Sequence, residues 1–214
     1  MHRQKFQIFL LYGGGIDSTA LLFWLRDLYP AERITLVHVD YGQHALASER
    51  AAARYYAKRY NLEFVKLKTD FSFSSAEILK RSSGSADVDV NNRLELRNVA
   101  LITLVASYAA STVPEGTTSM LALGFHQEPA NAPFPDARPD FLLPLEYSLN
   151  LATNSPIRLL APLVTKTRTE ILKFAIGKDR SILMRSHTCY KKVPCGVCTH
   201  CYQREQMLKE IGIE

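Results

Sequence analysis

The sequence predicts an α/β protein built on a doubly wound parallel sheet of about five strands, with a small cysteine-rich region and a helix at its C-terminus. Short apolar runs alternate along the chain with segments of helical periodicity. These runs are apolar at nearly every position, which is typical of parallel strands that helices cover on both faces. With 214 residues, of which 47% are hydrophobic, the chain is long enough to bury one full core.

The elements are expected in a regular order. Strands are predicted over residues 6–12, 33–39, 62–67, 118–124 and 157–160, and helices over 19–28, 45–60, 95–111, 140–151 and 167–176, with Pro144 a kink in the fourth helix. Ligands of such sheets bind at the carboxyl ends of the strands, so the loops after Tyr12, Val39, Gly124 and Leu160 should converge. The stretch 70–92 is rich in Ser, Asp and Asn, and it fits a mobile lid or a plain surface loop equally well.

The first strand runs directly into three consecutive glycines. Gly13, Gly14 and Gly15 are followed by Ile16-Asp17-Ser18-Thr19, where a helix opens. Glycines let backbone N–H groups approach a phosphate closely, and the helix N-terminus adds free donors and a positive dipole end. A tight strand-to-helix turn with Asp17 or Ser18 as the N-cap is the alternative. Three glycines exceed what a turn needs, so the pattern favours phosphate binding.

All four cysteines of the chain fall within thirteen positions. Cys189, Cys195, Cys198 and Cys201 follow the spacing Cys-x5-Cys-x2-Cys-x2-Cys, which suits one tetrahedral Zn²⁺. Disulfides across two-residue gaps are strained, and an iron–sulfur cluster stays an alternative. Four protein ligands leave no open position on the metal, so the ion is expected to be structural. The boundaries expected are 1–180 for an α/β domain and 181–214 for a zinc-binding subdomain.

Composition narrows the class of protein. No apolar run approaches the length of a membrane span, and the basic N-terminus leads straight into the first strand without a cleavage site. Together with the clustered thiols, this predicts a cytoplasmic protein. The net charge of +5 is mild, and the Lys and Arg residues are scattered, which argues against nucleic acid as a partner.

Further polar residues follow the predicted strands. Asp40 ends the second strand, where a ribose- or adenine-contacting group is often placed, although a turn explains it as well. Arg97 opens a long helix, from which its planar fork can clamp phosphate. Lys166 precedes the capping box formed by Thr167 and Glu170, so capping does not explain it. It is a candidate to neutralise a leaving pyrophosphate.

The region after the fourth strand combines aromatic, acidic and basic residues. Gly124, Glu128, Asp136 and Arg138 lie in or beside two short segments, 124–128 and 134–138. This combination suits a flat polar heterocycle, and a proline-rich surface loop would look similar.

The glycine loop resembles Ser-Gly-Gly-x-Asp-Ser/Thr, the motif of the N-type ATP pyrophosphatases, with Tyr12 in place of the serine. The wider set of motifs resembles the 7-cyano-7-deazaguanine synthase family over nearly the whole chain. These motifs are Gly13-Gly14-x-x-Asp17-Ser18-Thr19, Asp40-Tyr41-Gly42-Gln43, Arg97-Asn98, Phe134-Pro135-Asp136-x-Arg138-x-Asp140-Phe141, Lys166, Thr188-Cys189-Tyr190 and Cys195-Gly196-x-Cys198-x-x-Cys201. The pairing of the loop with a four-cysteine knuckle is the most specific part.

The resemblance implies an adenine nucleotide alpha hydrolase-like fold and a two-stage reaction. ATP would adenylate 7-carboxy-7-deazaguanine, ammonia would displace AMP to give an amide, and a second adenylation would allow dehydration to the nitrile. It implies Mg²⁺, a structural Zn²⁺ and a homodimer. The residues implied in catalysis are Lys166, Arg97 and Asp17. ATP would be bound by Leu11, Tyr12, Gly13, Gly14, Gly15, Ile16, Asp17, Ser18, Thr19 and Asp40. The substrate would be bound by Gly124, Glu128, Asp136 and Arg138, and the metal by Cys189, Cys195, Cys198 and Cys201.

Departures from the family pattern leave other functions open. Glu95-Leu96 stands where the family has Pro-Gly, and the basic run after Gly42-Gln43 is reduced to His44-Ala45-Leu46. A diverged member would stop at an amide, or join the acid to another amine, even one on a protein. Two further alternatives are a tRNA-modifying ATP pyrophosphatase and a non-enzymatic zinc-binding interaction module.

Overall fold

The computed structural model describes residues 5–69, 96–126 and 135–213. Its centre is a parallel sheet with strand order β3-β2-β1-β4-β5. The strands are β1 (Phe6–Leu11), β2 (Ile34–Asp40), β3 (Glu63–Lys68), β4 (Thr118–Ala122) and β5 (Ile157–Leu160). β1 lies in the middle, and its Ile8 is in register with Ile34 of β2 and Met120 of β4. The predicted five-stranded parallel sheet is therefore confirmed.

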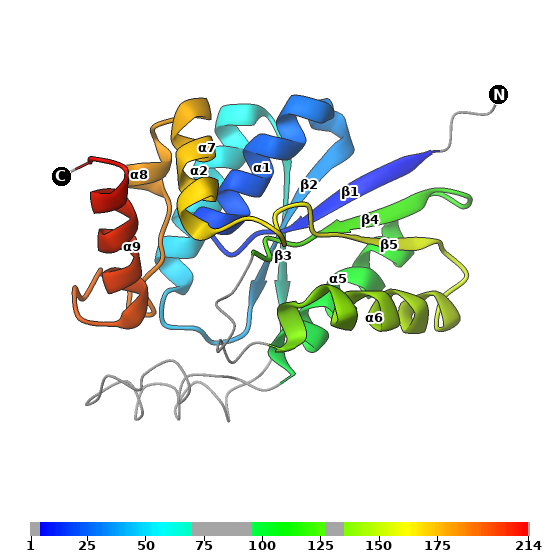
Figure 1. Cartoon of the computed structure of the whole chain (residues 1–214). Coiled ribbons are helices and arrows are strands. Elements are labelled where there is room, and N and C mark those ends of the chain that lie inside the picture. The colour runs from blue at the N-terminus through cyan, green and yellow to red at the C-terminus, as the bar shows by residue number, and fades with distance from the viewer. Residues whose placement is uncertain (1–4, 70–95, 127–134, 214) are drawn as a thin grey trace.

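Helices cover both faces of this sheet (Figure 1). They are α1 (Ile16–Leu28), α2 (Leu46–Tyr60), α5 (Arg97–Thr112), α6 (Pro139–Leu151), α7 (Arg168–Lys178), α8 (Ile182–Arg185) and α9 (Thr199–Glu210), with short 3₁₀ turns at Ala31–Arg33 and Pro135–Ala137. α1, α2 and α7 pack on one face, while α5 and α6 pack on the other. The chain leaves β1 toward β2 and later returns to β4 on its other side, so the winding reverses between β1 and β4. That reversal opens a crevice at the carboxyl ends of these two strands.

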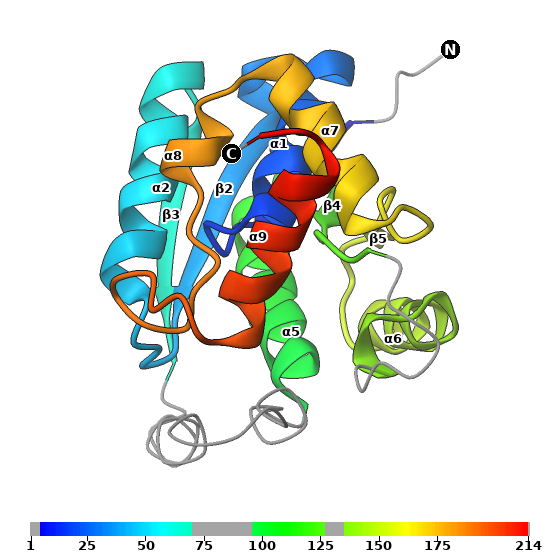
Figure 2. The same ribbon diagram turned by 60° about the vertical axis from the view of Figure 1, so that its left-hand side comes forward.

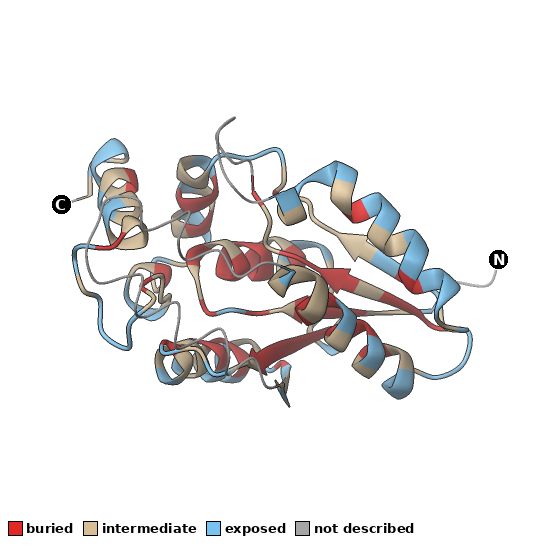
Figure 3. Ribbon diagram, turned by 90° about the horizontal axis from the view of Figure 1, so that it is seen from below, coloured by how far each residue is buried: buried red, intermediate tan, exposed pale blue. Residues whose placement is uncertain are grey.

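The central strand shows why the runs are apolar throughout. Ile8 and Leu10 are buried in the core under α1, and Phe9 between them is buried in the core under α5. Successive side chains of a strand point to opposite faces, and here both faces are covered. Figure 3 shows the same distribution, with burial concentrated in the sheet and its adjoining helix surfaces. The outer side of α6 stays exposed, including Leu143 and Tyr147.

Helix α1 begins earlier than the apolar periodicity predicts. Its N-cap is Gly15, and Asp17 and Ser18 lie inside the first turn rather than at the cap. The alternative in which one of these side chains caps the helix is therefore wrong. The capping box predicted for Thr167 and Glu170 is present at the start of α7.

The C-terminal lobe, residues 181–213, packs directly on the α/β domain (Figure 2). Ile182 of α8 and Met207 of α9 belong to the same buried cluster as α1 and α7. Arg204 of α9 donates hydrogen bonds to the Ser186 hydroxyl and to the Leu183 carbonyl. The lobe therefore shares the core of the domain that it covers. Within the described residues, no helix is both long and apolar enough to cross a membrane.

Candidate functional site

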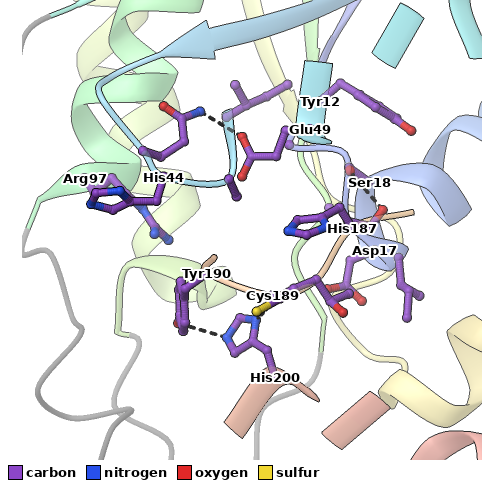
Figure 4. A pocket seen from close by; sticks show the side chains of 18 of the residues that line it. Tyr12, Asp17, Ser18, His44, Glu49, Arg97, His187, Cys189, Tyr190 and His200 are labelled. Atoms are coloured by element: carbon purple, nitrogen blue, oxygen red, sulfur yellow. Dashed lines mark hydrogen bonds between the residues drawn. The ribbon is translucent and has the colours of Figure 1, made fainter. Parts of the chain in front are cut away.

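A cavity of about 360 Å³ lies at the carboxyl end of the sheet. The β1–α1 loop, the β2–α2 loop, the start of α5, the segment after β4, the start of α7 and the C-terminal lobe all contribute to its lining. The predicted convergence is therefore confirmed for the loops after β1, β2 and β4, whereas after β5 it is Arg168, the first residue of α7, and not the loop before it that lines the cavity. Figure 4 shows side chains from several of these elements pointing into the same space.

The glycine loop forms one wall of the cavity. Gly13 lines it, and a Cβ added at this position would have no other atom within 4 Å. Gly14 differs, because its φ is +74° and a Cβ there would lie 2.8 Å from the Cα of Glu49. The N-cap Gly15 offers no side chain to the first turn of α1, whose N–H groups have no partner within the helix. An exposed glycine beside an uncapped helix N-terminus suits an anion.

Tyr12 directs its ring into the core, although its backbone lines the cavity. The ring is 1% exposed and meets Tyr56 edge to face, and its hydroxyl lies 2.8 Å from Oγ1 of Thr19. Burial raises the pKa of this phenol far above its usual value. The hydroxyl is thus engaged with Thr19, away from the position that a phosphate on the loop would occupy. The carbonyl of Tyr12 accepts a hydrogen bond from Nδ1 of His38 (3.0 Å).

Asp17 and Arg168 face each other across the cavity. Oδ2 of Asp17 lies 3.8 Å from an Arg168 guanidinium nitrogen and 3.9 Å from Nε2 of His126. Arg168 also donates to His126 (2.9 Å) and to the side chain of Gln203 on α9. Among the described residues, the buried Oδ1 of Asp17 has no hydrogen-bond partner. A buried carboxylate oxygen without a hydrogen-bond partner is well suited to bind a cation.

Sequence reasoning missed Arg168, although its position at the start of α7 places a guanidinium in the cavity. Lys166, which the sequence singled out, lies two residues earlier with an exposed side chain. Within the described chain, the cavity lining includes Arg168 and not Lys166. A second cation two residues after the predicted one was the signal available in the sequence.

The four cysteine sulfurs gather at one point in the C-terminal lobe. All lie within 4.8 Å of one another, with Cys189 Sγ 3.6 Å from Cys195 Sγ and 3.9 Å from Cys198 Sγ. Sulfurs bound to one tetrahedral Zn²⁺ at about 2.3 Å lie about 3.8 Å apart. In a [4Fe–4S] cluster each thiolate binds a different iron, so the four sulfurs would be spread more widely than they are here. The arrangement fits a zinc knuckle.

Burial and hydrogen bonds give the thiols of this cluster different pKa values. Burial raises the pKa of Cys189 and raises that of Cys198 to about 12. Despite its own burial, Cys195 has a pKa lowered to about 6, because backbone N–H groups of Val197 and Cys198 donate to its sulfur. Four thiolates cannot share so small a volume without a cation. The donor set therefore calls for a metal ion that keeps all four ionised.

The C-terminal lobe also holds the glycine loop in place. The N–H of His187 donates to the carbonyl of Gly14 (2.8 Å), and the Ser48 hydroxyl donates to the carbonyl of Lys192 (2.7 Å). His200, between two of the cysteines, bonds through one ring nitrogen to the Thr188 carbonyl (2.9 Å). Loop, α2 and lobe thus form one connected structure around the cavity.

The start of α5 carries a strained residue. Leu96, the N-cap, has a φ of 59° in the left-handed region, which glycine adopts without cost. This is the position where the family pattern noted above has glycine. Arg97, the next residue, lines the cavity together with Asn98. The strain therefore lies directly beside a residue predicted to act in the site.

Glu49 is a second residue that sequence reasoning missed. It lies in the first turn of α2 and lines the cavity, where Gln43 donates to its Oε2 (2.8 Å) and Nε2 of His38 lies 3.9 Å away. Burial raises its pKa to about 7. In the sequence it is one polar residue of an ordinary helix, so no local signal singles it out.

The predicted site residues divide into two groups. Those that line the cavity are Leu11, Tyr12, Gly13, Gly15, Ile16, Asp17, Ser18, Arg97, Gly124, Cys189, Cys195 and Cys198. Described residues outside the lining are Gly14, Thr19, Asp40, Asp136, Arg138, Lys166 and Cys201. The Asp40 carboxylate is paired with Arg50 at 2.7 Å. Glu128 and the whole stretch 70–92 lie outside the described residues.

Comparisons with known proteins identify the family of the chain. The family model "Queuosine biosynthesis protein QueC" matches residues 7–212. A 7-cyano-7-deazaguanine synthase of Helicobacter pylori strain P12 is 29% identical over 93% of this chain and 92% of its own. One from Pyrococcus furiosus is 27% identical over 94% and 91%. A solved structure, the NH3-dependent NAD synthetase of Campylobacter jejuni, aligns with 98% of this chain and 80% of its own at 19% identity and a TM-score of 0.48. The glycine loop, the cysteine knuckle and a match over nearly the whole chain lead to one conclusion: this protein is an enzyme of the queuosine biosynthesis protein QueC family.

Proposed function

We propose that the protein uses ATP to convert 7-carboxy-7-deazaguanine and ammonia into 7-cyano-7-deazaguanine through adenylated intermediates. The observation that carries this proposal is one cavity with the glycine loop on one side and the cysteine lobe on the other. The family match supplies the substrate class, because the relatives it resembles are named for this product.

The nucleotide is assigned to the glycine-loop side. Backbone donors from Gly13 to Ser18 would hold phosphate at the start of α1. Asp17, whose Oδ1 has no hydrogen-bond partner within the described part of the chain, would hold Mg²⁺, which would offset the negative charge of the phosphates. Arg97 and Arg168 would stabilise the negative charge that develops as pyrophosphate leaves. Lys166 keeps a proposed part in this task, from its exposed position beside the start of α7.

The heterocycle is assigned to the region after β4. Gly124 and Phe125 line the cavity there, and a Cβ at Gly124 would lie 3.0 Å from the backbone nitrogen of Ser18. A side chain at this position would crowd the backbone at the start of α1. We assign Asp136, Arg138 and Glu128 to the polar edge of the heterocycle. The 3₁₀ turn that carries Asp136 contacts both α5 and α6.

The remaining assignments concern the protein as a whole. Zn²⁺ on the four cysteines would stabilise the subdomain 181–214, because few apolar side chains of that lobe are buried. Four cysteines that form no disulfide and a proposed requirement for ATP support a cytoplasmic location as part of this proposal. Ammonia is the proposed nitrogen donor, and the active form is proposed to be a homodimer.

One incubation tests the proposed function. The protein is mixed with ATP, Mg²⁺, 7-carboxy-7-deazaguanine and ammonium, and products are identified by mass spectrometry. The nitrile, with AMP and pyrophosphate, is the expected result. An amide as the end product would assign the chain to the diverged, amide-forming alternative. Neither product, and no pyrophosphate release that depends on the acid, would refute the proposed function.

A further inference from the structure

We propose that Glu49 is the catalytic residue that accepts a proton from the attacking nitrogen in the amination step. The inference rests on the proposed function, which requires an amine to attack an adenylated carboxylate. It extends that function by assigning a base to the reaction, a role that the glycine loop and the cysteines do not fill.

The position of Glu49 allows contact with a substrate on the glycine loop. Its backbone lies directly beneath Gly14, and its side chain turns into the cavity that Gly13 lines. Figure 4 shows the carboxyl group facing the same space as Ser18 and His187. One carboxyl oxygen accepts the hydrogen bond from Gln43. Among the described residues no hydrogen bond uses the other oxygen, so it is open to a ligand.

The groups around Glu49 fix its protonation behaviour. Nδ1 of His38 faces a backbone carbonyl, which accepts hydrogen bonds, so the proton of the neutral ring is on Nδ1. Nε2 therefore carries no proton, and it lies 3.9 Å from a carboxyl oxygen of Glu49. Burial lowers the pKa of His38, which keeps that ring neutral. The cations and titratable groups on the other sides are Arg97 from α5, the phenol of Tyr41 and the ring of His187. Burial outweighs the positive charge of Arg97, and the carboxyl exchanges its proton near neutral pH.

Other histidines of the cavity have their ring nitrogens engaged or exposed. His200 donates to one backbone carbonyl, and its second nitrogen lies 2.9 Å from the Tyr190 hydroxyl. His187 donates through Nε2 to a carbonyl of its own loop (2.7 Å). His44 is exposed at the cavity edge. Asp17, the other carboxylate in the lining, faces a guanidinium and is assigned to Mg²⁺. Among the described residues, Glu49 forms no ion pair with a lysine or arginine within 4 Å, although the charge of Arg97 acts on it from α5.

The proton accounting of the amination is as follows. The nitrogen lone pair of ammonia forms a bond to the carbonyl carbon of the acyl adenylate while the C=O π pair moves onto its oxygen, which gives a tetrahedral intermediate with a positively charged N–H₃ group. The Glu49 carboxylate takes one of its protons and becomes a carboxylic acid. When the carbonyl oxygen re-forms the C=O bond, AMP is the group expelled. The C–O bond to AMP breaks, its electron pair leaving on the phosphate oxygen, and the amide remains. The carboxylic acid returns its proton to water through its open oxygen.

The experiment separates adenylation from amination in the full-length, zinc-containing protein. Glu49→Gln keeps the shape and the hydrogen bond with Gln43 and removes the base. Acid-dependent exchange of pyrophosphate into ATP should stay within about threefold of the parental rate. Amide formation with ammonia should fall by about 100-fold or more, the usual size of general-base catalysis. Glu205→Gln, on the exposed face of α9, is the matched control and should leave both rates unchanged.

Two further readouts distinguish a base from a structural residue. The parental rate per free ammonia should rise with pH to a plateau with a midpoint near the pKa of Glu49, about 7, and the variant should lose this dependence. Hydroxylamine should restore much of the lost rate, because its protonated adduct is acidic enough to lose its proton to water.

If Glu49→Gln does not fold, Gln43→Met serves instead. Removing a bond that favours the carboxylate should shift the midpoint to higher pH.

Each outcome decides a separate question. No acid-dependent exchange in the parental protein refutes the proposed function. Exchange in the parental protein together with parental amination by Glu49→Gln refutes only the role of Glu49. Equal loss of exchange and amination would assign Glu49 to nucleotide binding and also overturn the inference. A pH dependence that survives in Glu49→Gln would also overturn the inference.

Discussion

Replacing Glu49 with glutamine should stabilise the protein at neutral and alkaline pH. Burial raises the pKa of this carboxyl from 4.5 to about 7, so the folded protein binds the proton more tightly than the unfolded chain. The cost of ionising the buried group is absent at low pH. It appears as pH rises from 4.5 and is complete above about 7. Glutamine carries no such charge and avoids this cost.

The size of the effect follows from the shift. Each pKa unit corresponds to about 1.4 kcal/mol, so the shift of Glu49 amounts to about 3 kcal/mol at full ionisation. The side chain is 17% exposed, and the solvent that reaches it lowers this figure. We expect Glu49→Gln to gain about 2 kcal/mol over the parental protein between pH 5 and pH 8.

Denaturant unfolding at several pH values measures this gain. The free energy of unfolding of both proteins is taken at pH 5, 6, 7 and 8, and the difference between them isolates the contribution of Glu49. That difference should grow through pH 6 and 7 and then level off. A difference that is the same at every pH would show that Glu49 titrates normally, and the reasoning from burial would be wrong. The surface variant Glu205→Gln controls for the loss of one carboxylate.

Four other outcomes are expected. Gly13→Val should abolish ATP-dependent pyrophosphate release while the thermal midpoint of unfolding stays unchanged, because the valine side chain would enter open space in the cavity. Release at the parental rate would show that the glycine loop does not bind phosphate. Cys198→Ala should lower the bound zinc, measured by elemental analysis, and the thermal midpoint together; a fully metallated, stable variant would contradict a structural ion. Arg168→Ala should lower the rate of pyrophosphate release more than Lys166→Ala does, and the reverse order in the same assay would favour the exposed lysine. Leu96→Gly should raise the free energy of unfolding by up to about 1 kcal/mol through relief of its left-handed backbone, and a loss of stability would show that the side chain matters more than the strain.

The strands could be predicted because the sheet is buried on both faces. Every residue from Ile34 to Val39 is buried, so β2 is visible in the sequence as a largely apolar run in which Thr35 and His38 are the polar positions. The start of α1 was harder to place, because its first turn faces the cavity and carries the polar Asp17 and Ser18. The bounds of α9 could not be derived at all. Met207 is its one buried residue, so the helix has no apolar periodicity to detect.

The same distinction applies to the site. The glycine loop and the cysteines are contiguous in sequence, and their chemistry depends on local spacing, which a sequence displays. Glu49 and Arg168 depend on packing between elements far apart in the chain. Arg168 lies inside a capping box that accounts for its neighbours, and only the direction of α7 decides that its side chain enters the cavity rather than that of Lys166. Such choices require the assembled structure.

The hydrogen bond from His187 to the carbonyl of Gly14 links two binding events that share no ligand atom. If zinc orders the cysteine lobe, it also orders the donor that holds the glycine loop, and a nucleotide on that loop strengthens the same contact from the other side. Thermodynamic reciprocity then requires ATP to tighten zinc by the factor by which zinc tightens ATP. On the proposed assignments, an ion without an open coordination site would thereby act as an effector of nucleotide binding.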